Sequence, residues 1–260
     1  MRHINRAVLA AWFPWITMIV VVCACGVIVW HEVNVIRNAE PSAKRPVVVV
    51  DPGHPSGTNS ARRVLNGTTE LQINWDIAQR LVPVLEAKGI EAILTKNSRD
   101  EFLSNKDRAI IANDHNADLT IHLHCDAGPG RGYTLYYPAR QGEIGKQIGP
   151  SEEVIESSAT AAEMMHSGMQ SILAGYLRDR GVKGDDETKV GSKHGALTTS
   201  VFSEVPTVTV EMVFLSNKHD ADFIKSDEGQ VRMTAALTRG IEQYLLSVGY
   251  KERDGRFLQK

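Results

Sequence analysis

The 260-residue chain is 42% hydrophobic and 23% charged, and its formal net charge is −2. This composition excludes a disordered or fibrous protein and is sufficient for one folded domain of ordinary size. Two of the 29 basic residues and none of the 31 acidic ones lie in residues 1–30, so the remainder is acidic, which argues against nucleic acid as a partner.

Residues 1–30 predict a transmembrane helix. No charged side chain interrupts residues 7–30, and about 24 apolar residues are enough to span a bilayer as a helix. Two arginines precede this stretch, so the positive-inside rule places the rest of the chain outside the cytoplasm. A cleaved signal peptide is the alternative, but the apolar stretch is longer than that of a usual signal peptide. Residues 22–25 also loosely resemble a lipoprotein cleavage site. Residues 31–45 are expected to form a juxtamembrane linker.

The rest of the chain alternates between strand-like and helix-like segments. Apolar runs predict strands at 47–50, 91–95, 119–124, 132–137 and 207–212, and apolar spacing predicts helices at 69–88, 105–116, 152–180 and 230–247. This alternation predicts a single α/β domain over 46–250, with a twisted, mostly parallel sheet and helices on both faces. Residues 251–260 are expected to be a polar tail.

The first predicted strand ends in Asp51-Pro52-Gly53-His54. In open α/β sheets, ligands bind beyond the carboxyl ends of strands. A Pro-Gly turn at this position would direct His54 over the edge of the sheet. Such a sequence can also be a simple turn, so His54 is a candidate that needs support from elsewhere in the chain.

The third predicted strand lies in "ADLTIHLHCDAG". Strand alternation places His122, His124 and Asp126 on one face and Cys125 on the other. Neutral imidazole is the commonest metal ligand, and buried polar groups need partners. The sequence therefore predicts a metal site here or, alternatively, a pair of hydrogen-bonded structural histidines. Cys125 is expected to lie in the core.

Two glutamates are further candidates. Glu70 opens the first predicted helix, where it could also simply complement the helix dipole. Glu211 lies in "TVTVEMVFLSN", and a carboxylate in such an apolar strand has to be paired or functional. A structural salt bridge is the alternative for Glu211.

Together these motifs resemble the zinc-dependent N-acetylmuramoyl-L-alanine amidases. The resemblance covers nearly all of residues 46–248. It rests on DPGH, the helix-opening glutamate, "DRAIIAN", the "HLHCDAG" strand end, "GYTLYYP", "RDRGVK" and "VEMVFLSNKHDADFI". Several motifs in one order are more specific than any single motif.

The resemblance implies that His54, Glu70 and His124 bind Zn²⁺. Two histidines and one carboxylate leave a coordination position open, as a hydrolytic zinc site requires. It implies that Glu211 takes a proton from the attacking water and passes it to the leaving amine. The substrate would be peptidoglycan, cleaved between N-acetylmuramic acid and the L-alanine of the stem peptide.

The chain departs from the family pattern in three places. The loop after His54 reads "PSGTNSARRVLNG", His122 replaces a serine, and Asp126 replaces an asparagine. His122 therefore competes with His124 as a ligand, although motif register favours His124. His194 is a spare candidate near the pocket. The segment 139–153 is too short for an inhibitory helix, so no obligate protein partner is expected.

Other classes of protein explain the sequence less well. "HLHCD" partly fits the metallo-β-lactamase motif, which requires a further histidine where this chain has Ala127. An amidohydrolase barrel would need a longer chain. A membrane-tethered, non-catalytic peptidoglycan binder would be expected to lack a ligand or the base. The expected protein is a single-pass bacterial membrane protein with an extracytoplasmic zinc amidase domain.

Overall fold

The structure, a computed structural model, describes residues 45–57 and 60–258. Its main sheet has six strands in the order β2-β1-β3-β8-β4-β7. These are β1 (Val47–Pro52), β2 (Glu91–Leu94), β3 (Leu119–Asp126), β4 (Tyr133–Tyr137), β7 (Asp179–Gly184) and β8 (Thr207–Phe214). β2, β1, β3 and β8 are parallel, whereas β4 is antiparallel to β8 and parallel to β7. The sheet is therefore mixed and mostly parallel.

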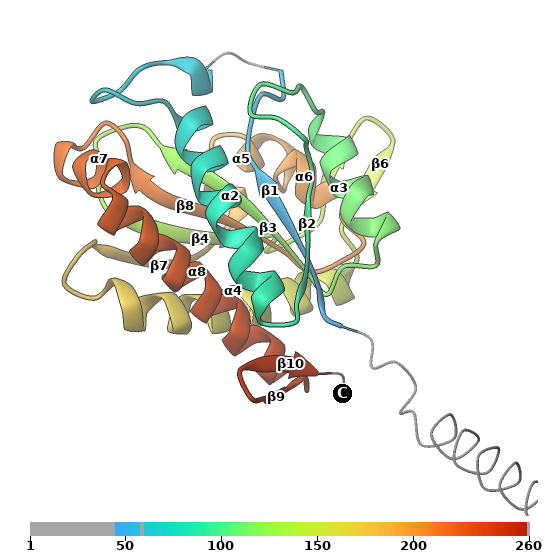
Figure 1. The fold of residues 1–260 in the computed structure, drawn as a ribbon. Helices are drawn as coiled ribbons and strands as arrows, with labels where there is room; N and C mark the ends of the chain where they lie inside the picture. The colour runs from blue at the N-terminus through green and yellow to red at the C-terminus, as the bar shows by residue number, and fades with distance from the viewer. Residues whose placement is uncertain (1–44, 58–59, 259–260) are drawn as a thin grey trace, which may run out of the picture. The chain divides into compact units, whose positions relative to one another are not determined.

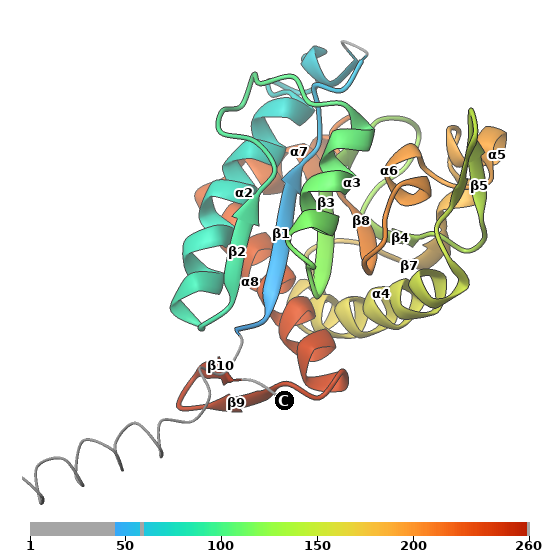
Figure 2. The ribbon, with the colours of Figure 1, turned by 90° about the vertical axis from the view of Figure 1, so that its right-hand side faces the viewer.

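Helices cover both faces of this sheet (Figures 1 and 2). One face carries α2 (Glu70–Ala87), α4 (Glu152–Leu173) and α8 (Asp227–Ser247); the other carries α3 (Asn105–Asp114) and the short α5 (Gly191–His194) and α6 (Thr198–Val201). α7 (Lys218–Lys225) joins β8 to α8, and η1 (Ser60–Arg62) and η2 (Asp185–Glu187) are single 3-10 turns. The predicted α/β architecture is confirmed at this level.

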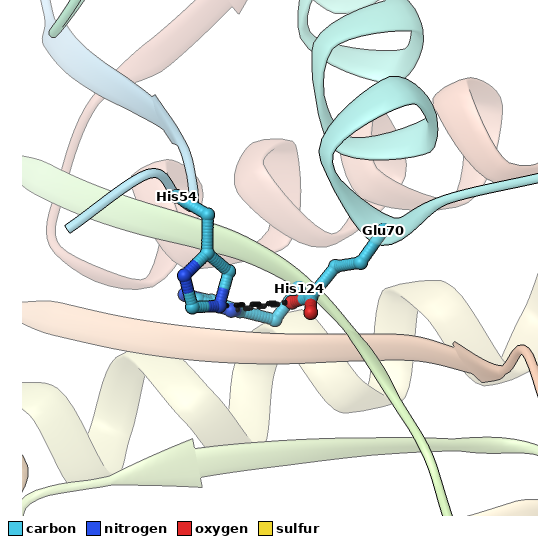
Figure 3. A group of neighbouring side chains, drawn as sticks. All are labelled: His54, Glu70 and His124. Atoms are coloured by element: carbon cyan, nitrogen blue, oxygen red, sulfur yellow. Dashed lines mark hydrogen bonds and ion pairs between the residues drawn. The ribbon is translucent and has the colours of Figure 1, made fainter. Parts of the chain in front are cut away.

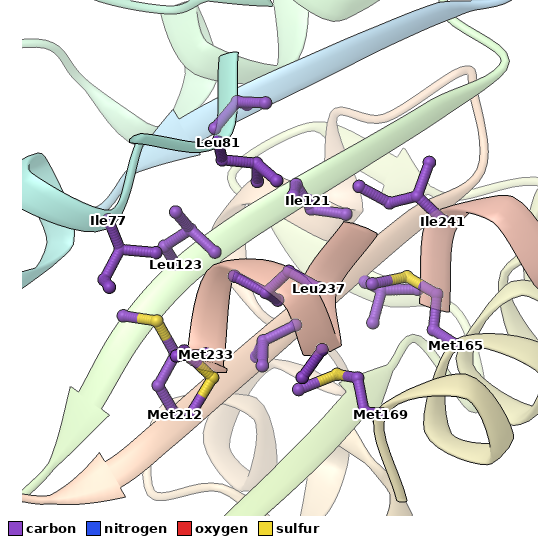
Figure 4. Packing of buried hydrophobic residues seen from close by; sticks show 14 of the residues in the cluster. Ile77, Leu81, Ile121, Leu123, Met165, Met169, Met212, Met233, Leu237 and Ile241 are labelled. Carbon is purple, nitrogen blue, oxygen red and sulfur yellow. The ribbon is translucent and has the colours of Figure 1, made fainter. Parts of the chain in front are cut away.

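The main apolar core lies between the sheet and the three long helices (Figure 4). Alternate residues of β3, Ile121 and Leu123, are fully buried against residues of α2 and α8 such as Ile77 and Leu237. The opposite face has only a small apolar cluster around Val49. Most of the burial therefore lies on one side of the sheet, and the other side is free to carry polar groups.

Several boundaries differ from the sequence-based predictions. The expected helix 152–180 ends at Leu173, and β7 follows it. Gly175 has φ +83, a left-handed conformation that ends helices. β5 (Gly142–Ile144) and β6 (Gln147–Gly149), as well as α5, α6 and α7, were not expected.

The last segment is also more ordered than expected. Residues 251–260 were expected to form a polar tail, but β9 (Lys251–Arg253) and β10 (Arg256–Leu258) form a hairpin. Phe257 of this hairpin is buried. The alternation of Phe257 with exposed Arg256 and Leu258 is too short to predict a strand from the sequence. The rest of the domain has to bury one face of the hairpin before the alternation acquires a meaning.

The predicted anchor 1–30 lies outside the described residues, and so does the linker 31–45 apart from Arg45. Within the part of the chain that is described, no helix has both the length and the apolar character needed to cross a membrane.

Candidate metal centre and its cleft

The end of β1 brings His54 close to His124. Gly53 donates its N–H to the carbonyl of Leu123 at 2.9 Å. A Cβ atom at position 53 would lie 2.4 Å from Cε1 and Nε2 of His124, so only glycine fits without displacing that ring. His54 itself has φ +63, a left-handed conformation that is uncommon outside glycine and clusters at functional sites.

Two buried cations hold the backbone around His54. Lys96 donates from Nζ to the carbonyl of His54, and Arg108 donates to the carbonyls of Pro52 and Pro55 at 3.2 and 3.3 Å. Both side chains are about 1% exposed. Burial, followed by the charge of Arg108, lowers the pKa of Lys96 to about 8. The strained histidine is therefore fixed by its surroundings rather than by its own preference.

Asp51 balances this positive charge from the end of the same strand. Its carboxylate lies 2.5 Å from Nη1 of Arg108 and 2.7 Å from Nδ1 of His122, and it also accepts from Thr95. Burial alone would raise the pKa of Asp51. The hydrogen bond from His122 and the charge of Arg108 outweigh burial and hold the pKa well below its usual range.

Glu70 and His124 complete a three-residue cluster with His54 (Figure 3). Thr69 caps α2 and places Glu70 in its first turn, while His124 projects from β3. Nδ1 of His124 lies 2.9 Å and Nε2 of His54 lies 3.4 Å from the same oxygen of Glu70. Burial raises the pKa of Glu70, but its hydrogen bonds to the two histidines, His124 first, lower the pKa well below its usual range.

The donor set fits a zinc ion. Nitrogen and oxygen ligands about 2.1 Å from zinc lie roughly 3.4 Å apart in a tetrahedron, and the ligand atoms here lie within 4.8 Å of one another. Nδ1 of His54 is buried without a hydrogen-bond partner among the described residues. The three side chains are 16 to 23% exposed, so a bound ion could still be reached by a substrate.

Glu211 lies directly opposite His124 on the neighbouring strand β8. Its Oε2 is buried and has no hydrogen-bond partner among the described residues. Burial first, then the negative charges of Glu70 and Asp126, raise the pKa of Glu211 well above its usual value. No salt bridge within the described part of the chain involves Glu211, so the structure gives no support to the structural alternative.

The cluster lies where two cavities meet, and both cavities are lined by His54, His124 and Glu211. One, here called the Tyr136 arm, has a volume of about 260 Å³ and is further lined by Tyr136, Thr188, Thr198, Thr199 and Thr209. The other, the Arg63 arm, has a volume of about 330 Å³ and is further lined by Arg63, Leu65, Asp126, Ala127 and Leu215. The site is therefore a single cleft with two arms.

The remaining sequence candidates have other surroundings. His122 is 3% exposed and lies between Asp51 and Thr207, so it does not join the cluster. His194 is exposed on a separate cavity beside Arg140. Cys125 is buried in the core as expected.

Sequence reasoning missed Lys96 and Arg63. Lys96 comes directly after the predicted strand 91–95, so the rule that located His54 could also have found it. The sequence contains no signal that separates Arg63 from Arg62.

Comparison with known proteins identifies the family of this chain. Residues 48–243 match the N-acetylmuramoyl-L-alanine amidase family. This chain belongs to that family. Its substrate class is therefore peptidoglycan and its activity that of an N-acetylmuramoyl-L-alanine amidase.

Two relatives are characterised amidases by name. The N-acetylmuramoyl-L-alanine amidase AmiA of Escherichia coli is 30% identical, with 72% of this chain and 57% of AmiA covered. The amidase LytC of Bacillus subtilis is 29% identical, with 77% of this chain and 36% of LytC covered. This chain thus spans about half of the first relative and about a third of the second.

A solved structure confirms the fold. The amidase AmiC2 of Nostoc punctiforme superposes with a TM-score of 0.62 at 24% identity, covering 78% of this chain and 99% of that one.

Proposed function

We propose that this amidase is a membrane-anchored zinc enzyme that hydrolyses the bond between N-acetylmuramic acid and L-alanine outside the cytoplasm. His54, Glu70 and His124 would hold Zn²⁺. When bound, the ion polarises the amide carbonyl and lowers the pKa of a water molecule to about 7. The anchor in this proposal rests on the apolar residues 7–30 and the two arginines that precede them.

Glu211 is the proposed acid and base, and its position carries the proposal. Among the described residues, Glu70 and Glu211 are the glutamates that line the cleft. Glu70 is a member of the metal cluster, which leaves Glu211 as the glutamate available for acid–base chemistry. A general base has to be ionised before it can accept a proton. A raised pKa brings the proton affinity of Glu211 closer to that of the attacking water and the leaving amine, between which it transfers the proton. From this position Glu211 can accept a proton from the attacking water and return it to the leaving amine.

The test compares the full chain in detergent with its Glu211→Gln variant. Both are incubated with peptidoglycan, and mass spectrometry measures free stem peptides that begin with L-alanine. We expect release by the wild type and a loss of about 10² to 10⁴ in the variant, the usual contribution of a positioned acid or base. Metal analysis should still find one zinc per chain in both proteins. Glu204→Gln, at an exposed glutamate away from the cleft, is the control.

The alternative, a tethered peptidoglycan binder, predicts a different outcome. A wild-type protein that contains zinc, binds peptidoglycan and releases no peptide would favour it. Chelation of the metal should abolish release, and added zinc should restore it. Residues 142–149 form the hairpin of β5 and β6, and we propose that the enzyme is active without an added protein. Release that appears only with a partner would contradict this part of the proposal.

A further inference from the structure

The two arms of the cleft differ in the side chains that line them. The Tyr136 arm is lined in part by hydroxyl groups, such as those of Tyr136, Thr198 and Thr199, and Lys189 is its basic residue. The Arg63 arm has Arg63 as its basic residue, and it also contains the carboxylates of Asp126 and of Glu70, the latter a member of the metal cluster. The substrate is asymmetric as well, because its muramic acid half is an uncharged sugar once the lactyl group is in amide linkage, whereas the peptide half ends in a carboxylate.

The geometry of the cleft requires the sugar half and the peptide half of the substrate to extend in different directions from the scissile amide. The scissile amide has to lie at the junction, beside the metal cluster and Glu211, because a general base acts within hydrogen-bond reach. One half of the substrate must then extend into each arm. Each arm offers one basic group that could pair with the peptide carboxylate, Lys189 in the Tyr136 arm and Arg63 in the Arg63 arm, and the geometry that each group offers to a carboxylate decides between them.

Arg63 has no partner among the described residues. The structure gives it no ion pair or hydrogen bond within the described residues, whereas the adjacent Arg62 is paired with Asp100 at 2.6 Å on the other side of the loop. Asp126, the acid in the same arm, does not pair with Arg63. The positive charge of Arg180 already acts on Asp126, where it opposes the effect of burial on the pKa.

The support beneath Arg63 is rigid. Leu65 and Thr68 exchange backbone hydrogen bonds at 2.8 and 3.1 Å. Nδ2 of Asn66 donates to the carbonyl of Leu215, itself a wall of this arm, at 2.8 Å, and Lys225 donates to the carbonyl of Asn66 at 2.6 Å. A binding group on a fixed support loses less conformational freedom when its ligand arrives.

We infer that the Arg63 arm binds the stem-peptide half of the substrate, and that Arg63 binds a carboxylate of that peptide. The inference rests on the proposed function and adds the orientation of the substrate to it. An arginine fork matches a carboxylate with two parallel hydrogen bonds, which lysine cannot reproduce.

The test measures hydrolysis of two muramoyl peptides, one with free peptide carboxylates and one with the same carboxylates amidated. For Arg63→Gln we expect KM for the free substrate to rise about tenfold, with a much smaller change in kcat, as for a charge-assisted hydrogen bond at a partly exposed site. The wild type should show the same rise in KM on the amidated substrate, and the variant should no longer distinguish the two. Arg62→Gln should behave as the wild type, and Arg63→Lys should recover only part of the affinity.

Binding separates this inference from the proposed function. Calorimetry on Glu211→Gln, with and without Arg63→Gln, measures the affinity for a stem peptide beginning with L-alanine, free or amidated, and needs no turnover. A preference for the free peptide that disappears with Arg63→Gln supports the inference even if no hydrolysis is found. An equal loss of affinity for both peptides, or no loss of affinity, would overturn the inference, because Arg63 would then not bind the carboxylate.

Discussion

The two faces of the central sheet consist of alternate residues of the same strands, yet they differ in composition. Toward α2, α4 and α8, β3 presents Ile121 and Leu123, which are fully buried in the apolar core. Toward the cleft it presents His122 and His124, which meet carboxylates. The comparison shows that the apolar face stabilises the sheet while the polar face contains buried charges that are stable only as complete networks.

The largest expected effect on stability lies in the polar face. Arg108→Met would leave Asp51 buried without its closest cation, and removal of one partner of a buried pair costs about 3 to 5 kcal/mol. Chemical denaturation should show this decrease in the free energy of unfolding. Arg99→Met, at an exposed pair with Asp100, should change it far less, because exposed ion pairs contribute little to stability. Equal effects of the two variants would contradict the contrast drawn between buried and exposed charges.

On the apolar face, Leu123→Ala should destabilise the fold by about 3 kcal/mol, because it removes a fully buried side chain and leaves a cavity. We expect the folded fraction to keep its zinc, since Leu123 points away from the cleft. Zinc content measured alongside unfolding tests whether the two faces are separable. Loss of metal from the still folded protein would indicate that they are coupled.

Gly53→Ala should have the opposite effects to Leu123→Ala: a large loss of zinc affinity and a small loss of stability. The new Cβ would collide with the ring of His124, so we expect zinc affinity to fall about 100-fold, at the upper end for changes that reorient a ligand. The free energy of unfolding of the metal-free protein should change much less than in Leu123→Ala. Competition with a chelator measures the affinity. An unchanged affinity would show that the ring can move without loss of the site.

The last effect depends on pH and concerns the wall of the Tyr136 arm. Asp185 accepts hydrogen bonds from the amide of Leu197 at 3.0 Å and the hydroxyl of Ser200 at 2.7 Å. Burial, with a further contribution from Asp186, raises the pKa of Asp185 from 3.8 to about 6. The folded protein therefore holds this proton up to about pH 6, whereas the unfolded chain loses it near pH 4.

It follows that this group makes the fold less stable as pH rises from about 4 to about 6, with no further change above. We expect Asp185→Asn, which does not titrate, to gain up to about 3 kcal/mol relative to wild type over this range, because each unit of difference in pKa corresponds to about 1.4 kcal/mol. Unfolding of both proteins at pH 4 and pH 7.5 measures the difference. A difference that does not vary with pH would exclude Asp185 as the titrating group.

Much of the local structure follows from the sequence alone. The Val47–Val50 run, the Thr69 cap and the alternation around His124 depend on neighbouring residues, so strand, helix start and side-chain direction could be predicted. The same information placed His54, Glu70, His124 and Glu211 as candidates, with the family resemblance assigning their roles.

The tertiary structure decided which candidates meet. His122 and His124 share a face of β3, and only the arrival of Asp51, 71 residues earlier in the chain, occupies His122 and leaves His124 beside Glu70. Arg62 and Arg63 are equivalent in sequence until the loop directs one toward Asp100 and the other toward the cleft. Periodicity is a property of neighbouring residues and can be read along the chain, whereas pairing between distant segments depends on how the whole sheet and its helices pack.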